Sequence, residues 1–365
     1  MIAFCRSKTL IELEDLGWSD FFSDQPMEAF EQMEGIIPAR VSREDRVAYD
    51  LVTQGGEVIR AKVGGGLRYR AGSREELPAV GDWVLARMIG DGEAMIMMVF
   101  ERRSMLARQA AGDRTGLQII AANVDTIFIV TSMNQEFEPR RLERYLLSVW
   151  ESGANPVIVL NKRDLADDPH WYEDQAEEVA AGAPVVSLSA IEGAQPLARW
   201  LQPGKTIALV GSSGVGKSTI INALAGEELM ATGGIREDDD EGRHTTTARH
   251  LHVLPEGRGV LVDTPGMREL QLWAGDQGAE ALFEDILELS EHCRFRDCQH
   301  GDEPGCAVQQ AIEDGDLSPG RLASYEKLQR ELDYHRRRQD VASQRNESRR
   351  LGKIYRNAQR YNQKL

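Results

Sequence analysis

The chain has 365 residues and a net charge of −16, with 41% hydrophobic and 28% charged residues, a balance typical of soluble globular proteins. Its length predicts two or three domains, no apolar run of about 18 residues predicts a membrane span, and the N-terminus lacks a secretory signal pattern. We therefore expect a cytoplasmic protein without a membrane partner, whose net acidity neither requires nor excludes an RNA partner.

The first two predicted segments are an acidic extension and a small β-barrel. Residues 1–34 contain eight Asp or Glu against two Lys or Arg, and we expect them to be helical or loosely packed. Residues 35–105 have the alternating polarity and Gly-Gly turn of short antiparallel strands, and so many short strands predict a barrel. The strands are expected at residues 46–52, 57–63, 82–88 and 94–101.

From residue 106 the pattern becomes α/β. Continuous apolar runs have the length of buried parallel strands and alternate with helical stretches, which predicts a doubly wound sheet over residues 106–277. The strands are expected at residues 125–130, 156–160, 184–188, 206–210 and 259–262, and the helices at 140–151 and 171–181.

A guanine site is predicted where two of these strands end. The N-K-x-D pattern is formed by Asn161, Lys162, Arg163 and Asp164. The Asp164 carboxylate would accept hydrogen bonds from guanine N1–H and the 2-amino group, which adenine lacks, so GTP would be selected over ATP. We expect Asn161 to brace the site and Lys162 to lie along the ring. The pair Ser189 and Ala190, after the next strand, would give a backbone N–H to guanine O6.

The phosphate site is predicted by the pattern G-x-x-x-x-G-K-[ST], which links the strand 206–210 to a helix. Its glycines let backbone N–H groups converge on phosphate oxygens; Lys217 would reach the β- and γ-phosphates, and the Ser218 hydroxyl would bind Mg²⁺. The alternative is a glycine-rich turn without a ligand, which the flanking strand and helix disfavour. The expected GTP contacts are Gly211, Ser212, Ser213, Gly214, Val215, Gly216, Lys217, Ser218 and Thr219.

Two later segments are expected to respond to the γ-phosphate. Asp263 ends a strand and would hold the Mg²⁺ shell, and the Gly266 amide would meet the γ-phosphate. One of Thr245, Thr246 and Thr247 would complete the Mg²⁺ coordination and order its segment only with GTP. Plain surface turns are the alternative at both places.

Hydrolysis is expected to be slow without a partner. The residue after the D-T-P-G tetrapeptide is Met267, which cannot orient water as a glutamine does. The candidate catalytic residues are Lys217 and His244, and His244 is the candidate water-orienting group. For that histidine, packing or capping near the switch is the alternative.

The motifs occur in the order base, phosphate, switch, whereas ordinary GTPases carry the base elements last. The sheet of an ordinary GTPase stays the same if its N- and C-termini are joined and the chain is opened at another loop. We therefore expect a circularly permuted P-loop GTPase domain. The second switch then leads directly into residues 278–365. We hypothesise that the nucleotide state is transmitted to this segment.

The C-terminal segment is expected to be mostly helical and to hold one structural Zn²⁺. Three thiols and one imidazole lie within a short hydrophilic stretch, and four such ligands suit tetrahedral zinc with no open position for catalytic water. The expected ligands are Cys293, Cys298, His300 and Cys306, and His292 is a less suitable fourth ligand. Three buried cysteines beside an incidental histidine are the alternative.

A basic tail follows the zinc segment. Residues 321–365 contain 13 Lys or Arg and 5 Asp or Glu, a net charge of +8, which leaves −24 for residues 1–320. A helix is expected to start at Ser318-Pro319 with an apolar stripe on one face. The stripe consists of Leu322, Tyr325, Leu328 and Leu332.

With these motifs in this order, the sequence resembles the ribosome small subunit-dependent GTPases, also called RsgA- or YjeQ-like. The resemblance covers roughly residues 35–335 and rests on N-K-R-D, G-S-S-G-V-G-K-S, D-T-P-G, G-R-H-T-T-T and C-x₄-C-x-H-x₅-C. It implies an N-terminal OB-fold barrel, a permuted GTPase domain and a C-terminal zinc domain. The acidic segment before Gly35 stands outside this family pattern.

The resemblance also implies a function in late maturation of the small ribosomal subunit. It implies that the subunit and its rRNA are partners and that the subunit stimulates hydrolysis of GTP to GDP and phosphate. The lack of a catalytic glutamine at Met267 agrees with the family. Two alternatives stay open: a permuted GTPase acting on another ribonucleoprotein or partner, and an RNA-binding scaffold that holds GTP structurally. No DNA partner is expected, and a monomer is the simplest expectation.

The barrel contains three aromatic residues among arginines and lysines, namely Tyr49, Tyr69 and Trp83. Such a pattern suits single-stranded RNA, on whose bases aromatic rings stack. The alternative is that these rings belong to the barrel core. The basic tail is likewise either an RNA contact or a solvated helix.

Overall fold

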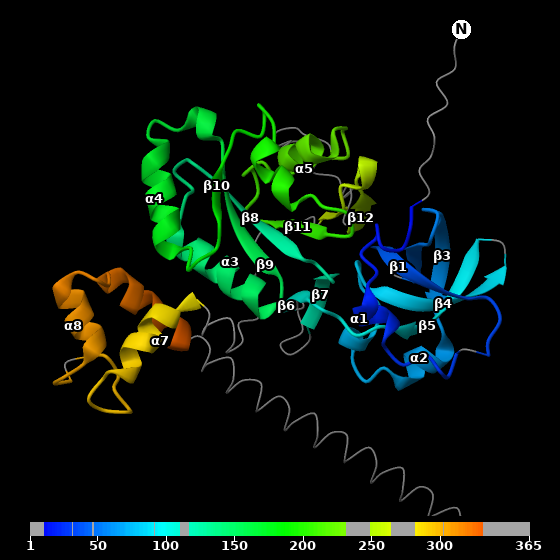
Figure 1. The fold of residues 1–365 in the computed structure, drawn as a ribbon, viewed down its shortest axis with the longest axis horizontal. Coiled ribbons are helices and arrows are strands. Elements are labelled where there is room, and N and C mark those ends of the chain that lie inside the picture. The colour runs from blue at the N-terminus through cyan, green and yellow to red at the C-terminus, as the bar shows by residue number, and fades with distance from the viewer. Residues whose placement is uncertain are drawn as a thin grey trace, which may run out of the picture. The chain divides into compact units, whose positions relative to one another are not determined.

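The computed structural model describes residues 11–30, 32–45, 47–90, 92–109, 117–230, 249–263, 282–301 and 303–330. The chain divides into two compact units (Figure 1). The first spans residues 1–109 and 117–273, and the second spans residues 110–116 and 274–365. Within the described ranges, no helix is long and apolar enough to cross a membrane.

The N-terminal part of the first unit is a five-stranded barrel. Its strands are β1 (Ile36–Glu44), β2 (Tyr49–Val52), β3 (Val58–Val63), β4 (Trp83–Gly90) and β5 (Glu93–Val99). They are ordered β1-β2-β3-β5-β4, and β4 pairs back onto β1, so the barrel is closed. Between β3 and β4 lie α2 (Gly65–Arg70) and the 3₁₀ turn η1 (Arg74–Glu76). The predicted OB-fold barrel is confirmed.

The strand β1 is not among the strands expected from the sequence, and it contains Pro38. Pro38 lies opposite Leu85 in the half of β1 that pairs only with β4, whereas β2 pairs from Arg40 onward. Proline has no N–H to donate, so it is tolerated where one side of a strand has no partner.

The described part of the acidic extension packs on the barrel. It contains the short helix α1 (Asp20–Ser23), and its Leu16 and Phe22 are fully buried. The Trp18 ring meets Trp83 of the barrel edge-on, with ring centroids 4.8 Å apart. Residues 11–30 are therefore part of the barrel core and not a separate element.

The barrel is followed by a two-stranded hairpin and then by the α/β sheet. The hairpin strands are β6 (Met105–Gln109) and β7 (Leu117–Ala122). The sheet strands are β8 (Thr126–Ser132), β9 (Asn155–Asn161), β10 (Val185–Ser187), β11 (Thr206–Val210), β12 (His250–Val253) and β13 (Val260–Asp263). Their order is β10-β9-β8-β11-β13-β12, with parallel pairing except at β12. The predicted doubly wound sheet is confirmed, and β12 is an addition to it.

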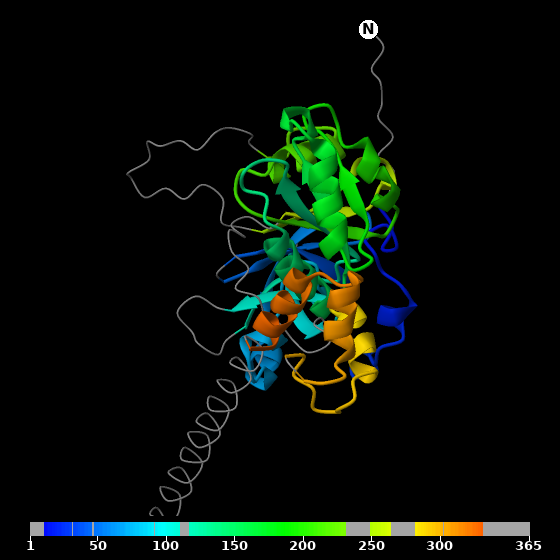
Figure 2. The same ribbon diagram turned by 90° about the vertical axis from the view of Figure 1, so that its left-hand side faces the viewer.

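Helices cover both faces of this sheet (Figures 1 and 2). The main helices are α3 (Pro139–Glu151), α4 (Pro169–Val179) and α5 (Lys217–Ala225), with 3₁₀ turns η2 (Arg163–Leu165), η3 (Gln195–Trp200) and η4 (Pro255–Gly257). On one face, Ile220 and Leu224 of α5 pack against Phe128 and Val159. The helices α3 and α4 contact the sheet at β8, β9 and β10. Alternate side chains of the buried strands therefore serve two separate cores.

The barrel and the α/β sheet are continuous. β12 pairs with β1 through Arg43 and His250, so the described strands of both parts form one eleven-stranded sheet. Arg249, directly before β12, donates to the Ile119 carbonyl at 3.0 Å and lies 3.8 Å from the Glu44 carboxylate. The start of β12 is thus anchored to both the hairpin and the barrel.

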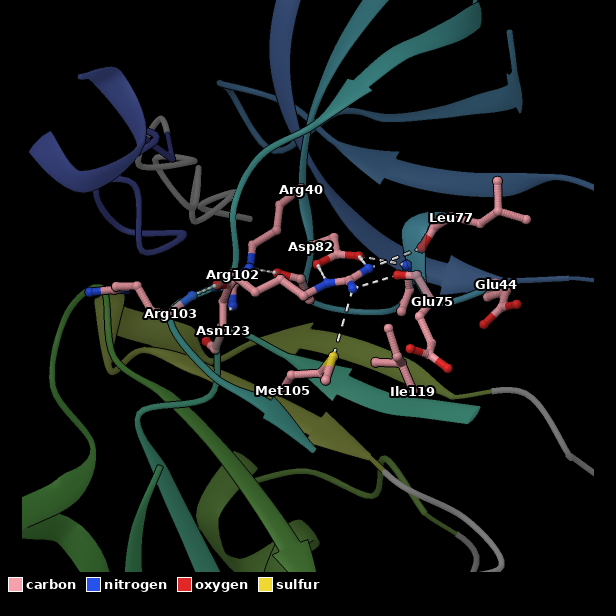
Figure 3. Close-up of polar contacts among 12 residues, drawn as sticks. Arg40, Glu44, Glu75, Leu77, Asp82, Arg102, Arg103, Met105, Ile119 and Asn123 are labelled. Atoms are coloured by element: carbon pink, nitrogen blue, oxygen red, sulfur yellow. Dashed lines mark hydrogen bonds and ion pairs between the residues drawn. The ribbon is translucent and has the colours of Figure 1, made fainter. Parts of the chain in front are cut away.

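A buried polar network joins the barrel to the start of the α/β part (Figure 3). Arg102 binds the fully buried Asp82 with two bonds of 2.7 Å. Arg40 is also fully buried and donates to the carbonyls of Gly81 and Asn123 at 3.2 and 3.1 Å, and to that of Leu16. One guanidinium therefore connects the extension, the barrel and the connection to β8.

The second unit is helical. It contains α7 (Glu284–Glu291), α8 (Ala307–Asp314) and a helix over residues 319–330. As predicted, the last helix begins at Ser318-Pro319, where the Ser318 hydroxyl accepts the Arg321 N–H at 3.2 Å. Leu322 and Leu328 are buried, and Tyr325 packs against Phe283. Leu332, the last expected member of this stripe, lies outside the described residues.

Candidate functional site

The phosphate loop connects β11 to α5, as its motif predicts. Gly211, Gly214 and Gly216 all have positive φ, at 144°, 80° and 97°. A Cβ atom at Gly211 would lie 2.1 Å from the Val130 carbonyl oxygen. These backbone conformations and close approaches require glycine, which explains the spacing of the motif.

The cation of the loop is Lys217, at the start of α5. Its Nζ donates to the carbonyls of Gly211 and Ser212 at 2.8 and 2.6 Å. Burial lowers the pKa of Lys217 to about 8, although the nearby Asp263 carboxylate opposes this shift. Burial raises the pKa of Asp263 to about 6, and Lys217 opposes that shift in turn. The end of β13 therefore supplies an acidic group beside the loop cation, in the place where the sequence predicts the magnesium partner.

Asn161 joins three loops at the carboxyl edge of the sheet. Its Nδ2 donates to the Val215 carbonyl in the phosphate loop at 2.8 Å, and its Oδ1 accepts the Ala190 N–H at 2.9 Å. A Cβ atom at Gly216 would lie 2.1 Å from the same Nδ2. The predicted bracing residue is thus fully buried and bound on both sides.

Among the remaining base-site residues, Ser189 holds Asp164, whereas Arg163 has its partner elsewhere. The Ser189 hydroxyl donates to the Asp164 carboxylate at 2.6 Å, and this bond ties together the loops after β9 and β10. Lys162 has a left-handed backbone with φ of 63°, which turns the chain sharply after β9. The Arg163 guanidinium lies 3.6 Å from Glu173 of α4, so its side chain has a partner outside the base loop.

The switch residues are outside the part of the chain that the structure describes. These residues are His244, Thr245, Thr246, Thr247, Gly266 and Met267. Their roles remain predictions from the sequence.

The second unit brings the four expected metal ligands together. One donor atom from each of Cys293, Cys298, His300 and Cys306 lies within 4.8 Å of all the others. The His300 Nδ1 is 3.7 Å from the Cys293 sulfur and 3.6 Å from the Cys306 sulfur, and these two sulfurs are 3.9 Å apart. A zinc tetrahedron with metal–sulfur bonds of about 2.3 Å has edges close to these lengths. The cluster fits a structural metal ion.

Residues around this cluster orient its ligands. The His300 Nε2 lies 3.0 Å from the Ser290 hydroxyl, which itself donates to the Ile286 carbonyl at 2.6 Å. Because the Ser290 proton is used in that bond, Ser290 accepts from Nε2–H and leaves Nδ1 free for a metal. The Glu303 carboxylate accepts the backbone N–H groups of Gln299 and Gly301 at 3.0 and 2.7 Å and shapes the loop.

The structure decides between the two interpretations of the barrel aromatics. Trp83 is 0% and Tyr49 is 8% exposed, so both rings belong to the core, and a role in stacking on RNA bases is wrong for them. Tyr69 is 91% exposed and stays available. Tyr49 also lines a cavity of about 430 Å³ with Lys62, Arg68 and other barrel residues.

Sequence reasoning missed two polar groups at these sites. Arg141 of α3 donates from Nη1 to the Ser212 hydroxyl of the phosphate loop at 3.0 Å. Ser290 supports the metal cluster, as described above. Neither residue belongs to a short sequence motif. Both lie in ordinary helices, and each is distant in sequence from the residue that it contacts, so only the three-dimensional structure identifies them.

Comparison with known proteins places these motifs in one family. The family profile described as RsgA GTPase matches residues 99–273. A protein called small ribosomal subunit biogenesis GTPase RsgA from Opitutus terrae is 46% identical over 357 residues, covering 94% of this chain and 96% of the relative. A protein of the same name from Methanosarcina acetivorans is 44% identical, covering 91% of this chain and 90% of the relative.

One relative bears on the acidic extension. The small ribosomal subunit biogenesis GTPase RsgA 2 of Vibrio vulnificus is 43% identical, covering 97% of this chain and 97% of the relative. So extensive an alignment includes most of residues 1–34. At least one relative therefore carries a counterpart of this segment.

Two solved structures share the architecture. YjeQ from Thermotoga maritima is 28% identical, with a TM-score of 0.61, covering 81% of this chain and 98% of that chain. YloQ, described as a circularly permuted GTPase, is 27% identical, with a TM-score of 0.58, covering 83% of this chain and 97% of that chain. The permuted order of base, phosphate and switch elements has a solved counterpart.

Proposed function

The chain belongs to the RsgA GTPase family and is a GTP hydrolase, and from this premise we propose that it acts in the biogenesis of the small ribosomal subunit. The observation that carries the proposal is the near full-length match to proteins named for that role. The hydrogen bonds of Asn161, which connect the predicted base loops to the phosphate loop, support the proposal that the protein binds a guanine nucleotide. We further propose that the subunit binds the protein through its rRNA in the cytoplasm and stimulates hydrolysis in late maturation.

We propose that guanine is recognised by the loops after β9 and β10. Asp164, held by Ser189, would pair with guanine N1–H and the 2-amino group. Because the Ala190 N–H is donated to Asn161 Oδ1, the backbone N–H of Ser189 is the member of the expected pair that would meet O6. The phosphate loop 211–219 would hold the phosphates, with Lys217 as their cation. Ser218 and Asp263, with a threonine of 245–247, would hold Mg²⁺, which supplies charge neutralisation at the phosphates.

We propose that the Cys-His cluster of the second unit holds a single structural Zn²⁺. Three sulfurs and one imidazole nitrogen are the donor set that zinc prefers in closed sites. Cys293, Cys298, His300 and Cys306 would hold it, and it would fix the loop between α7 and α8. Four protein ligands leave no position for substrate, so the ion would stabilise the fold.

We propose the domain boundaries that the motifs predict. They are an acidic segment 1–34, a barrel 35–105, a permuted GTPase domain 106–277, and a zinc-binding helical domain 278–365 with a basic tail. The packing of residues 11–30 on the barrel indicates that the first two segments fold together. A monomer that docks on a large particle remains the simplest assembly.

The deciding experiment is GTP turnover with and without purified small ribosomal subunits. We expect slow turnover alone and strong stimulation by the subunit, because Met267 stands where a water-orienting glutamine would help. Turnover without stimulation would favour a permuted GTPase acting on another ribonucleoprotein or partner. Absence of turnover in both conditions would favour an RNA-binding scaffold with structural GTP.

His244 is the proposed water-orienting residue of the stimulated reaction. The variant His244→Ala should lose most of the subunit-stimulated turnover while it keeps its affinity for GDP. Stimulated turnover equal to that of the unmodified protein would remove His244 from the mechanism.

A further inference from the structure

We propose that Arg141 is a positioning residue of the nucleotide site, which acts through Ser212 to hold the phosphate loop and adds a second positive charge at its phosphate end. The carrying contact is the bond of 3.0 Å from Arg141 Nη1 to the Ser212 hydroxyl. The proposal rests on the GTPase activity of the family and not on the ribosomal role.

The sheet topology explains why a helix residue reaches this loop. β8 and β11 are neighbouring parallel strands, with Ile129 opposite Val210. The chain leaves β8 to begin α3 at Pro139 and leaves β11 to begin the phosphate loop. Both connections therefore emerge at the carboxyl edge of the same two strands, where open α/β sheets bind their ligands.

The first turn of α3 places positive charge beside the phosphate loop. Its first turn carries Arg140 and Arg141 and no acidic residue, whereas the helix dipole favours negative charge there. Glu138, just before the helix, binds Arg141 Nη2 at 2.9 Å. That bond partly offsets the unfavourable placement of the arginine and leaves Nη1 for the Ser212 hydroxyl.

Two cations converge on Ser212 from different sides. Its carbonyl accepts Lys217 Nζ at 2.6 Å, and its hydroxyl accepts Arg141 Nη1. The Lys217 ammonium has three N–H donors, so with two on loop carbonyls it keeps one for the phosphates. Arg141 fixes the Ser212 hydroxyl, so the hydroxyl and the carbonyl of this residue are both held when the neighbouring amides meet the phosphates.

The test compares nucleotide affinities of the full-length variants Arg141→Ala, Arg141→Lys, Ser212→Ala and the double variant, with Arg140→Ala as the control. Arg140 is exposed in the same helical turn, so its removal changes the net charge equally. Arg141→Ala should weaken GDP and GTP-analogue binding roughly tenfold, as expected for the loss of a charge-assisted bond. Arg140→Ala should stay within about twofold, and Arg141→Lys should restore part of the loss.

The double variant distinguishes a positioning role from a general charge effect. If Arg141 acts through Ser212, the double variant should bind nucleotide no more weakly than Arg141→Ala alone. Additive losses of affinity in the double variant, or an unchanged affinity of Arg141→Ala, would each overturn the proposal. Equal melting temperatures of Arg141→Ala and Arg140→Ala exclude misfolding as the cause.

Discussion

At the scale of single residues, the nucleotide site depends on side chains that connect loops. Asn161 binds the phosphate loop and the loop after β10 at once, and Ser189 fixes Asp164. The sequence predicted that these residues belong to the base site because they lie in short motifs at the ends of strands. It could not predict Arg141 or Ser290, whose partners are 71 and 10 residues away and follow from packing alone.

Nucleotide affinity should depend on pH because of Lys217 and Asp263. The free Lys217 has a pKa of about 8, so above that pH it must take up a proton to meet the phosphates, and affinity should fall. The free Asp263 has a pKa of about 6, so below that pH it must lose a proton to hold Mg²⁺. Titration of fluorescent GDP between pH 5 and 9.5 should therefore show the tightest binding in the window from about 6 to about 8.

Measurements with and without Mg²⁺ separate the loss of nucleotide affinity at low pH from the loss at high pH. Without Mg²⁺ the loss of affinity on the acid side should vanish, while the alkaline loss should remain. An affinity that stays constant from pH 7 to 9 would contradict the assignment of the alkaline arm to Lys217.

Ser290 should control the metal affinity of the second unit. The variant Ser290→Ala removes the acceptor for His300 Nε2–H, so the ring is no longer held with Nδ1 toward the sulfurs. Loss of such a supporting bond typically weakens metal binding about 10- to 100-fold. Competition with a zinc chelator measures the effect, and Ser290→Thr, which keeps the hydroxyl, should bind close to normally. Equal chelator competition for Ser290→Ala and the unmodified protein would show that the bond is not needed.

At the scale of elements, the apolar strands of the central sheet were predictable, whereas β1, β12 and the hairpin strands β6 and β7 were not. β8, β9 and β11 are buried on both faces and read as continuous apolar runs. β12 has only four residues, two of them histidines, and its strand character depends on its neighbours β13 and β1. Its pairing is a product of tertiary structure that local sequence does not encode.

The phosphate loop should tolerate no side chain at Gly216. In Gly216→Ala, the new Cβ would lie 2.1 Å from Asn161 Nδ2, and the backbone has φ of +97°. The substitution should therefore displace both the phosphate loop and the base loop and abolish measurable GDP binding. Gly182→Ala is the matched control, since Gly182 has φ of +82° and nothing within 4 Å.

The control variant Gly182→Ala should lose about 1 kcal/mol of folding stability because of backbone strain, and it should keep its GDP affinity. If Gly216→Ala binds GDP as well as Gly182→Ala does, Asn161 is not the rigid link that its two bonds indicate.

At the scale of the whole first unit, Arg40 ties the extension, the barrel and the α/β part together. Burial lowers its pKa to about 10, so it stays charged at neutral pH. Arg40→Met would leave buried carbonyls of Leu16, Gly81 and Asn123 without this donor and should destabilise the protein by about 3–5 kcal/mol. Urea unfolding measures the change.

Arg60 provides the comparison for Arg40. It forms ion pairs of 2.5 Å with Asp45 and Asp50, but its side chain is 42% exposed. Arg60→Met should cost less than about 1 kcal/mol. Equal losses for the two variants would mean that Arg40 does not act as a buried junction.

The permuted connectivity gives a prediction for the second unit. Because the second switch leads directly into residues 278–365, their hydrogen exchange should differ between the GDP and GTP-analogue states. Identical exchange in the two states would remove the hypothesis that nucleotide state is transmitted along the chain.

The pairing of β12 with β1 also protects the molecule from self-association. β12 is the last strand of the α/β sheet on its side, and an uncovered strand edge presents N–H and C=O groups that recruit other chains. A shortened protein that starts at residue 106 would lack β1 and leave this edge open. The barrel thus acts as a cap against aggregation, and the two parts are best produced and studied as one piece.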